Sequence, residues 1–154
     1  MKKLLTLMFP GFVIALFIFS ACSKSSSNNN PPPKTKTELI SQGSWKFKSA
    51  TVNGSDASAL IQACQRDNIV VFAAAGTGNV NEGPTKCNAS DPSDIPFTWS
   101  FQNSETVLVV SSILFQGGSN TFQLEAVNTA QLVVSQGFSI GPGPVRNVII
   151  TFDH

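Results

Sequence analysis

GSWKFKSATV, residues 43–52, is the stretch that decides the fold. Trp45 and Phe47 alternate in it with Lys46 and Lys48, so an extended chain would turn one apolar face inward and one charged face to water. This period of two predicts a β-strand that is buried on one side only. Strands of that kind belong to antiparallel sheets with one face packed on a core.

Seven further strand segments are predicted after this one, because short runs of β-branched and aromatic residues alternate with turn residues. Between the first and second strands, the segment SDASALIQACQRD predicts one short helix or turn. In the segment 120–127 we expect Phe122, Leu124 and Ala126 to share the inward face. The predicted strands lie in residues 68–80, where a turn at Gly76 separates two of them, and in 96–102, 106–115, 120–127, 130–136 and 146–153.

Eight sequential antiparallel strands would leave two exposed edges in an open sheet, and closure into a barrel removes both edges. A two-sheet sandwich with crossed connections is the alternative. The links are short enough for hairpins, which favours an all-β, eight-stranded, up-and-down barrel with one short helix or turn in its first connection. The interior of such a barrel is either filled by side chains or able to hold one small ligand.

The first part of the chain predicts export. Lys2 and Lys3 precede an apolar run that ends at Phe19, which is the pattern of a secretion signal over residues 1–21. A transmembrane helix is the alternative, but the run is shorter than the roughly 20 residues that a span requires, and Pro10 interrupts it. The Ser-, Asn- and Pro-rich residues 22–36 predict an extended tether, so the folded domain is expected over 37–154.

Cys22 follows the small residues Ser20 and Ala21 directly after the apolar run. This arrangement resembles the lipobox of bacterial lipoproteins, with Phe19 standing where that family prefers leucine. The resemblance implies that Cys22 is lipidated, that the signal is removed, and that acyl chains hold the protein on a membrane. A plain signal peptide, the remaining alternative, would not need a cysteine at this position.

Charge and composition exclude several classes of function. Charged residues make up 12% of the chain, and 10 basic residues nearly balance 9 acidic ones, so the sequence offers no basic field for a nucleic acid. The single histidine, His154, has no visible partner, and tyrosine is absent. We therefore expect no catalytic site, no enzyme activity and no cofactor. Glu82, Asp91 and Asp94 form a loose acidic stretch that is more typical of a solvated turn than of a calcium site.

Cys64 and Cys87 form an even pair in a chain with an export signal, and exported thiols oxidise, which predicts a disulfide between them. A metal pair and a reactive thiol are the alternatives. A zinc site requires about four ligands, and His154 is the only histidine, so we expect no metal site.

Gly43 and Trp45, in Gly-Ser-Trp at the head of the first strand, look like the Gly-x-Trp signature of lipocalins. The order of GSWKFKSATVNG, ACQRDNIVVF, NEGPTKCNASDP, a tryptophan strand and FQLEAVNTAQLVVSQ resembles the small lipocalin-like lipoproteins of Bacteroidetes-type bacteria over about residues 37–153. The resemblance implies that Trp45 packs at the closed end of the barrel. It also places Cys64 and Cys87 where that group carries its two cysteines.

Two functions are expected from these features. The first is a membrane-anchored envelope lipoprotein whose barrel binds a small apolar ligand through residues such as Phe97, Trp99, Phe122 and Leu124. The alternative is a non-catalytic module with a filled barrel that contacts an envelope protein partner through its loops. By analogy with other bacterial lipoproteins, Ser23 implies the outer membrane. The absence of acidic residues from SKSSSNNN favours its periplasmic face, and the surface face stays open.

Overall fold

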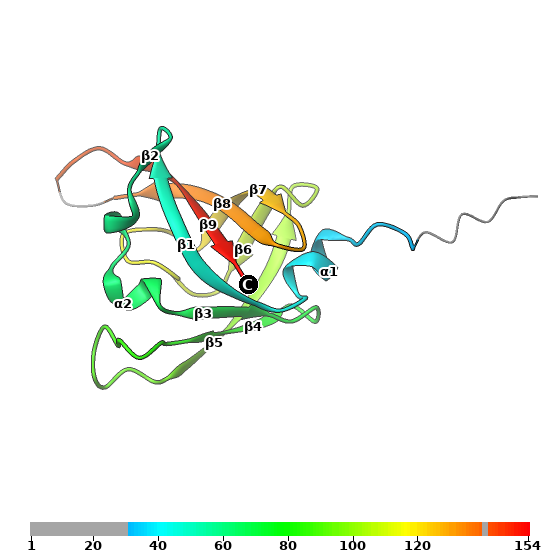
Figure 1. Ribbon diagram of the computed structural model, residues 1–154, viewed down its shortest axis with the longest axis horizontal. Coiled ribbons are helices and arrows are strands. Elements are labelled where there is room, and N and C mark those ends of the chain that lie inside the picture. The colour runs from blue at the N-terminus through cyan, green and yellow to red at the C-terminus, as the bar shows by residue number, and fades with distance from the viewer. Residues whose placement is uncertain (1–30, 140–141) are drawn as a thin grey trace, which may run out of the picture. The chain divides into compact units, whose positions relative to one another are not determined.

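The computed structural model describes residues 31–139 and 142–154, and its folded unit spans Pro33–His154 (Figure 1). The predicted signal peptide and Cys22 lie outside the described residues. The elements follow in this order: α1 (Lys36–Ile40), β1 (Ser44–Val52), β2 (Ser55–Asp56), the 3₁₀ helix η1 (Ser58–Leu60), α2 (Ala63–Arg66), β3 (Ile69–Phe72), β4 (Thr77–Asn81), β5 (Asp94–Gln102), β6 (Val107–Val110), β7 (Thr121–Val127), β8 (Gln131–Phe138) and β9 (Arg146–Asp153).

The strands form one closed barrel. Neighbours in the sheet follow the order β2-β1-β3-β4-β5-β6-β7-β8-β9, all neighbours are antiparallel, and β1 also pairs with β9. The two-residue β2 is the returning arm of a hairpin on β1, so the other eight of the nine strands make the barrel wall. This topology confirms the predicted up-and-down fold. The short helical segments η1 and α2 occupy the first connection, as expected.

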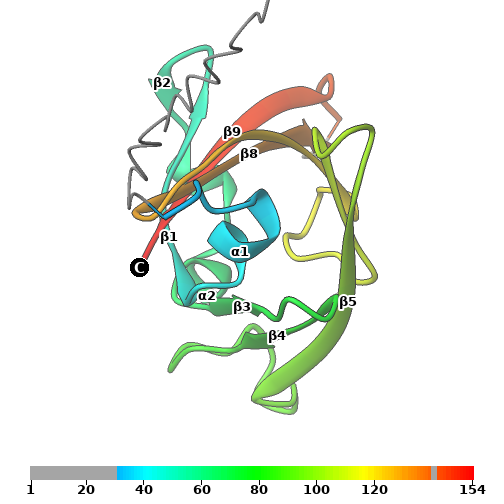
Figure 2. The ribbon, with the colours of Figure 1, turned by 90° about the vertical axis from the view of Figure 1, so that its right-hand side faces the viewer.

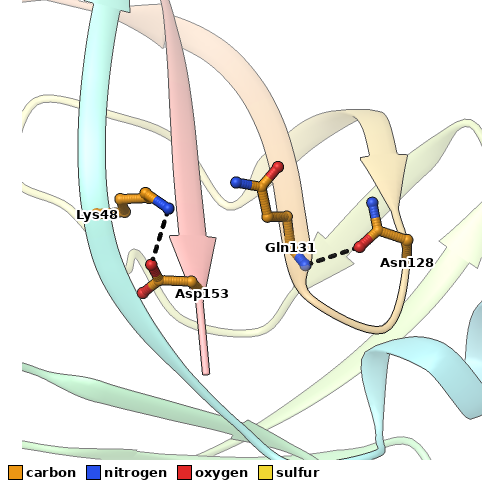
Figure 3. Close-up of polar contacts among 4 residues, drawn as sticks. All are labelled: Lys48, Asn128, Gln131 and Asp153. Atoms are coloured by element: carbon orange, nitrogen blue, oxygen red, sulfur yellow. Dashed lines mark hydrogen bonds and ion pairs between the residues drawn. The ribbon is translucent and has the colours of Figure 1, made fainter.

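The seam between β1 and β9 closes the barrel. Its register runs from Lys46 opposite Asp153 to Thr51 opposite Ile149, and the interior side of the seam holds Ala50 and Ile150, both 0% exposed. On the outer side, Lys48 Nζ lies 3.1 Å from Asp153 Oδ2 (Figure 3). An exposed ion pair of this kind contributes about 0–1 kcal/mol, so the backbone ladder and the buried side chains hold the seam.

Two bulges shift the inward face along the strands. In β1 the register changes between Phe47 and Ser49, so Trp45 and Phe47 face inward before the bulge and Ala50 faces inward after it. In β7 the register changes between Leu124 and Ala126, with Glu125 as the extra residue. Because a bulge reverses the alternation, Ala126 is exposed, and the expectation that it shares the inward face of Phe122 and Leu124 is wrong.

The fifth barrel strand is shorter than predicted. The strand β6 ends at Val110, whereas the sequence predicts a strand through Phe115. The Ser111 N–H still donates to the Thr98 carbonyl (2.8 Å), as the next rung of the ladder would. The Thr98 N–H, however, donates to the Ser111 hydroxyl (2.8 Å) instead of a backbone carbonyl, and the ladder ends there. Phe115, in the loop that follows, is 3% exposed. The apolar run therefore continues beyond the strand because the loop itself packs into the core.

One end of the barrel is covered by α1, which the sequence analysis did not predict. The Thr35 hydroxyl accepts from the Glu38 N–H (3.2 Å), and the Glu38 carboxylate accepts from the Thr35 N–H (2.7 Å), which is a capping box. These hydrogen bonds lower the pKa of Glu38. The helix lies over the barrel opening (Figure 2), with Ile40 fully buried and its carbonyl accepting from Trp45 Nε1 at 2.7 Å. The helix uses Thr35 and Lys36, the last residues of the predicted tether.

His154 joins the covered end as well, although the sequence showed no partner for it. Its ring stacks on Trp45 with centroids 4.0 Å apart, and its Nδ1 lies 2.8 Å from the Ser44 carbonyl oxygen. A Cβ at Gly43 would lie 3.1 Å from the His154 ring. Gly43 therefore leaves room for the imidazole, and Trp45 lies at the covered end of the barrel.

Cys64 and Cys87 lie at disulfide-bonding distance, with their Cα atoms 5.1 Å apart and a sequence separation of 23. Cys64 belongs to α2, and Cys87 belongs to the long β4–β5 link. A bond between them would tie two segments that the barrel ladder does not hold. The distance is the one that the predicted disulfide requires.

We predict that His154→Ala lowers the free energy of unfolding by about 1 kcal/mol, because it removes a ring stacked on a buried tryptophan. Urea unfolding followed by tryptophan fluorescence measures the loss. His154→Phe is the matched control, since it keeps an aromatic ring over Trp45, and it should recover most of the difference. A His154→Ala protein as stable as the wild type would show that the stacking contributes nothing.

We predict that the protein, isolated without reductant, shows no reactive thiol at Cys64 or Cys87 until it is reduced. Alkylation under denaturing conditions, with and without prior reduction, followed by mass spectrometry, measures this directly. The double variant Cys64→Ala/Cys87→Ala should lose about 3 kcal/mol of stability, because the bond restricts the unfolded chain. Labelling of both cysteines without reduction would contradict the disulfide.

Candidate functional site

The barrel interior is the predicted ligand site, and it holds a cavity of about 10 Å³. That volume matches about one water molecule by the same measure and is far below the hundreds of cubic ångströms of an ordinary ligand pocket. Every residue that lines it is apolar: Trp45, Val70, Phe72, Leu108, Leu114, Phe122, Leu132, Val134 and Phe152. The described interior is therefore filled by side chains.

Aromatic side chains fill one side of the interior. Phe72 packs edge-on against Phe97 and Trp99, with ring centroids 5.4 and 5.5 Å apart, and Trp99 packs in the same way against Phe101 at 5.3 Å. The Trp99 indole N–H lies 3.0 Å from both the Ala73 and the Thr77 carbonyl oxygens. Each ring therefore contacts another ring, and the one polar group of the cluster is already bonded.

The four residues that the sequence nominates for ligand binding are brought together only in part. Phe122 lines the small cavity and is 1% exposed. Phe97 and Trp99 are buried in the aromatic cluster outside the cavity lining, and Leu124 is partly buried against the core. Gly78 leaves no room beside them, because a Cβ there would collide with the Phe97 ring. The described residues therefore give Phe97, Trp99 and Leu124 packing contacts rather than a shared binding surface.

The end of the barrel opposite α1 is closed by the β6–β7 loop, residues 111–120. Phe115 packs between Phe138 and Phe152, with ring centroids 6.4 and 6.1 Å away. The loop is tied to the first connection, where the Gln116 N–H donates to Gln65 Oε1 at 3.2 Å. Leu114 from the same loop forms part of the cavity wall. The loop thus acts as a plug. Its apolar residues are the ones that the sequence analysis assigned to the end of a strand.

Gln136 is the one polar side chain that the alternation of β8 turns into the barrel, and the sequence analysis overlooked it. The residue is 4% exposed, and its Oε1 accepts from the Ser119 N–H (2.8 Å) and the Ser119 hydroxyl (3.1 Å). Its Nε2 has no partner among the described residues. The inward position of Gln136 could have been predicted from the strand alternation, because it is spaced by two residues from Val134 and Phe138. A polar residue at such a position is, however, equally compatible with a bulge.

Two residues of the acidic stretch are bonded to nearby asparagines, Asp94 across β4 and β5 and Asp91 within the β4–β5 link. The Asp94 carboxylate accepts from the Asn79 amide (2.7 Å) and the Asn81 amide (3.0 Å), and these hydrogen bonds lower the pKa of Asp94. Asp91 Oδ2 accepts from the Asn88 N–H at 3.1 Å. In the part of the chain that the structure describes, no three acidic, histidine or cysteine side chains gather in a metal-binding group.

The membrane-related predictions fall largely on residues that the structure does not describe. Cys22, the predicted lipidation site, is one of them. Among residues 31–139 and 142–154, no helix has the length and apolar character needed to cross a bilayer.

Comparison with known proteins identified no relative by family model or among curated proteins. No protein-family model matches the chain, and no curated protein matches it either.

Proposed function

We propose that this protein is a lipid-anchored protein of the bacterial envelope, and that its filled barrel is a non-catalytic scaffold for contact with another envelope protein. The observation that supports this most is the interior cavity of about 10 Å³, which leaves no volume for an organic ligand in the described conformation. A domain with a filled interior offers its outer surface and loops for recognition.

The anchor in this proposal comes from the resemblance of the Cys22 region to a lipobox. Each buried methylene of an acyl chain contributes about 0.8 kcal/mol, so one chain holds a protein marginally and two or three hold it stably. The residues that follow Cys22 are polar or proline, so they act as a spacer between the acyl chains and the folded domain.

The proposal assigns no reaction to the barrel. His154, the single histidine of the chain, has its ring stacked on Trp45 and its Nδ1 at hydrogen-bond distance from the Ser44 carbonyl. Its Nε2 lies 3.3 Å from Gln42 Nε2. Both ring nitrogens therefore have neighbours that belong to the fold, and the group that most often moves protons in enzymes serves packing here.

The wholly apolar lining of the cavity favours a second candidate function, the binding of a small apolar molecule inside the barrel. This function would require Leu114 and Phe115 to leave the barrel end so that Phe122 and its neighbours could contact a ligand. The β6–β7 loop that carries them contains Gly117 and Gly118, and Gly117 already has a positive φ of 84°.

We predict that Cys22→Ser moves the protein out of the membrane fraction, because it removes the attachment point of the acyl chains. Fractionation with and without detergent, together with mass spectrometry of the mature amino terminus, measures the change. Ser25→Ala, in the same tether, is the matched control and should leave the protein on the membrane. A wild-type amino terminus that carries no fatty acyl group would contradict the proposed lipid anchor.

We predict that the chain beginning at Ser23, without lipid or detergent, gives no saturable binding of an apolar fluorophore, because the interior has no free volume. A fluorescence titration measures this. If saturable binding occurs, Leu114→Phe locates it: loss of binding in that variant would place the fluorophore inside the barrel. That outcome would replace the filled scaffold with the ligand-binding function.

A further inference from the structure

A hollow lies at the barrel end away from α1, between the β1–β2 hairpin, η1 and the start of β9. Its volume is about 350 Å³. A second hollow of about 180 Å³ adjoins it and shares Leu60 and Arg146 with it. We call the two together the Leu60–Arg146 hollow. The first part is walled by Val52, Ala57, Ala59 and Leu60, with Asp56 and Arg146 as its charged groups.

The two charged groups of the hollow differ in what they already bind. Asp56 Oδ1 accepts from the Ser58 hydroxyl (2.6 Å) and the Ser58 N–H (3.1 Å), and these bonds lower the pKa of Asp56. Its carboxylate is therefore used to begin η1. Arg146 is exposed, and within the described ranges its guanidinium has neither an ion pair nor a hydrogen bond, since the ion pair found there joins Lys48 to Asp153.

A guanidinium carries five N–H donors in a planar fork that matches the two oxygens of a carboxylate. The apolar wall beside it is suited to an aliphatic side chain next to that carboxylate. In the second hollow, Phe138 and Pro144 continue the apolar wall beside Arg146. Two adjoining hollows that share one wall suit an extended chain better than a compact molecule, because successive side chains of a strand occupy separate sites.

The position of the hollow fits contact with another protein. The chain enters the folded unit at α1, and β1 runs from the α1 end toward β2 (Figure 1). Trp45 lies at the first end, where its indole donates to the Ile40 carbonyl of α1, and Val52, the last residue of β1, lines the hollow. The hollow is therefore at the barrel end remote from the point where the tether joins. A partner can approach it without meeting the α1 end.

We propose that the Leu60–Arg146 hollow docks an extended segment of a partner protein that presents a carboxylate beside an aliphatic side chain. Arg146 binds the carboxylate, and Leu60 with its apolar neighbours contacts the aliphatic group. This inference rests on the proposed scaffold function and adds to it a location and a partner chemistry.

The test uses the full-length protein in the envelope of the cells that produce it, with a photo-cross-linking residue in place of the exposed Ala59. We expect one discrete adduct with a protein partner. Arg146→Glu should reduce the adduct about tenfold, because it replaces an attractive charge with a repulsive one. Lys46→Glu is the matched control: it makes the same change of charge on an exposed β1 residue near α1, and it should leave the adduct unchanged.

The chemistry is tested by charge exchange. Mass spectrometry identifies the partner peptide joined to position 59, and its acidic residue is replaced by lysine. We expect this change to abolish the adduct with wild-type Arg146 and to restore it with Arg146→Glu. Failure of the exchange to restore the adduct, an adduct that survives Arg146→Glu, or an adduct with lipid or with a second copy of this chain would each overturn the inference.

Cross-linkers placed at exposed Thr98 and Gln116 separate this inference from the proposed function. A protein captured from those positions and not from position 59 would leave the scaffold function standing and overturn the Leu60–Arg146 hollow as its site. If none of the three positions captures a protein, both the site and the scaffold function fail. Equal melting temperatures of the Arg146→Glu and Lys46→Glu proteins exclude misfolding as the cause of a loss.

Discussion

The pairing of β1 with β9 is the constraint on which the rest of the structure depends. Once that seam is made, the sheet has no free long edge, and eight strands fix an interior only wide enough for side chains or one small ligand. The residues on the inward faces then decide between those outcomes. Large aromatic rings occupy the space, including Trp45 at 0% exposure and Phe122 at 1%, so closure and filling together remove the interior as a binding volume.

Because side chains fill the barrel interior, a ligand that entered it would have to offset the free energy of displacing them. Opening the far end would move Leu114 and Phe115 into water, at a cost of about 1.5–3 kcal/mol for each such side chain. The two together would lower an apparent affinity by roughly two to four orders of magnitude. Recognition at the outer surface carries no such cost, because Arg146 and Ala59 are exposed in the described conformation.

The strand number and the inward position of Trp45 could be predicted because both depend on local alternation and on the edge problem of an open sheet. Ala126 and Phe115 were misplaced because a bulge at Glu125 and a plug formed by the β6–β7 loop depend on contacts with other strands. His154 and Ile40 escaped prediction for the same reason. Both residues contact Trp45. His154 is more than a hundred positions away from it in the sequence, and Ile40 belongs to a helix too short to show a helical hydrophobic period.

A single guanidinium beside a few aliphatic side chains would bind weakly as a free pair of molecules, since exposed charge pairs contribute about 0–1 kcal/mol each. The proposed acyl anchor would change that balance, because a partner held in the same envelope would meet the site at a high effective concentration. In this proposal the anchor and the hollow have different tasks. The acyl chains at one end of the chain would supply most of the free energy of localisation, and the weak, exposed site at the far end of the barrel would supply selectivity.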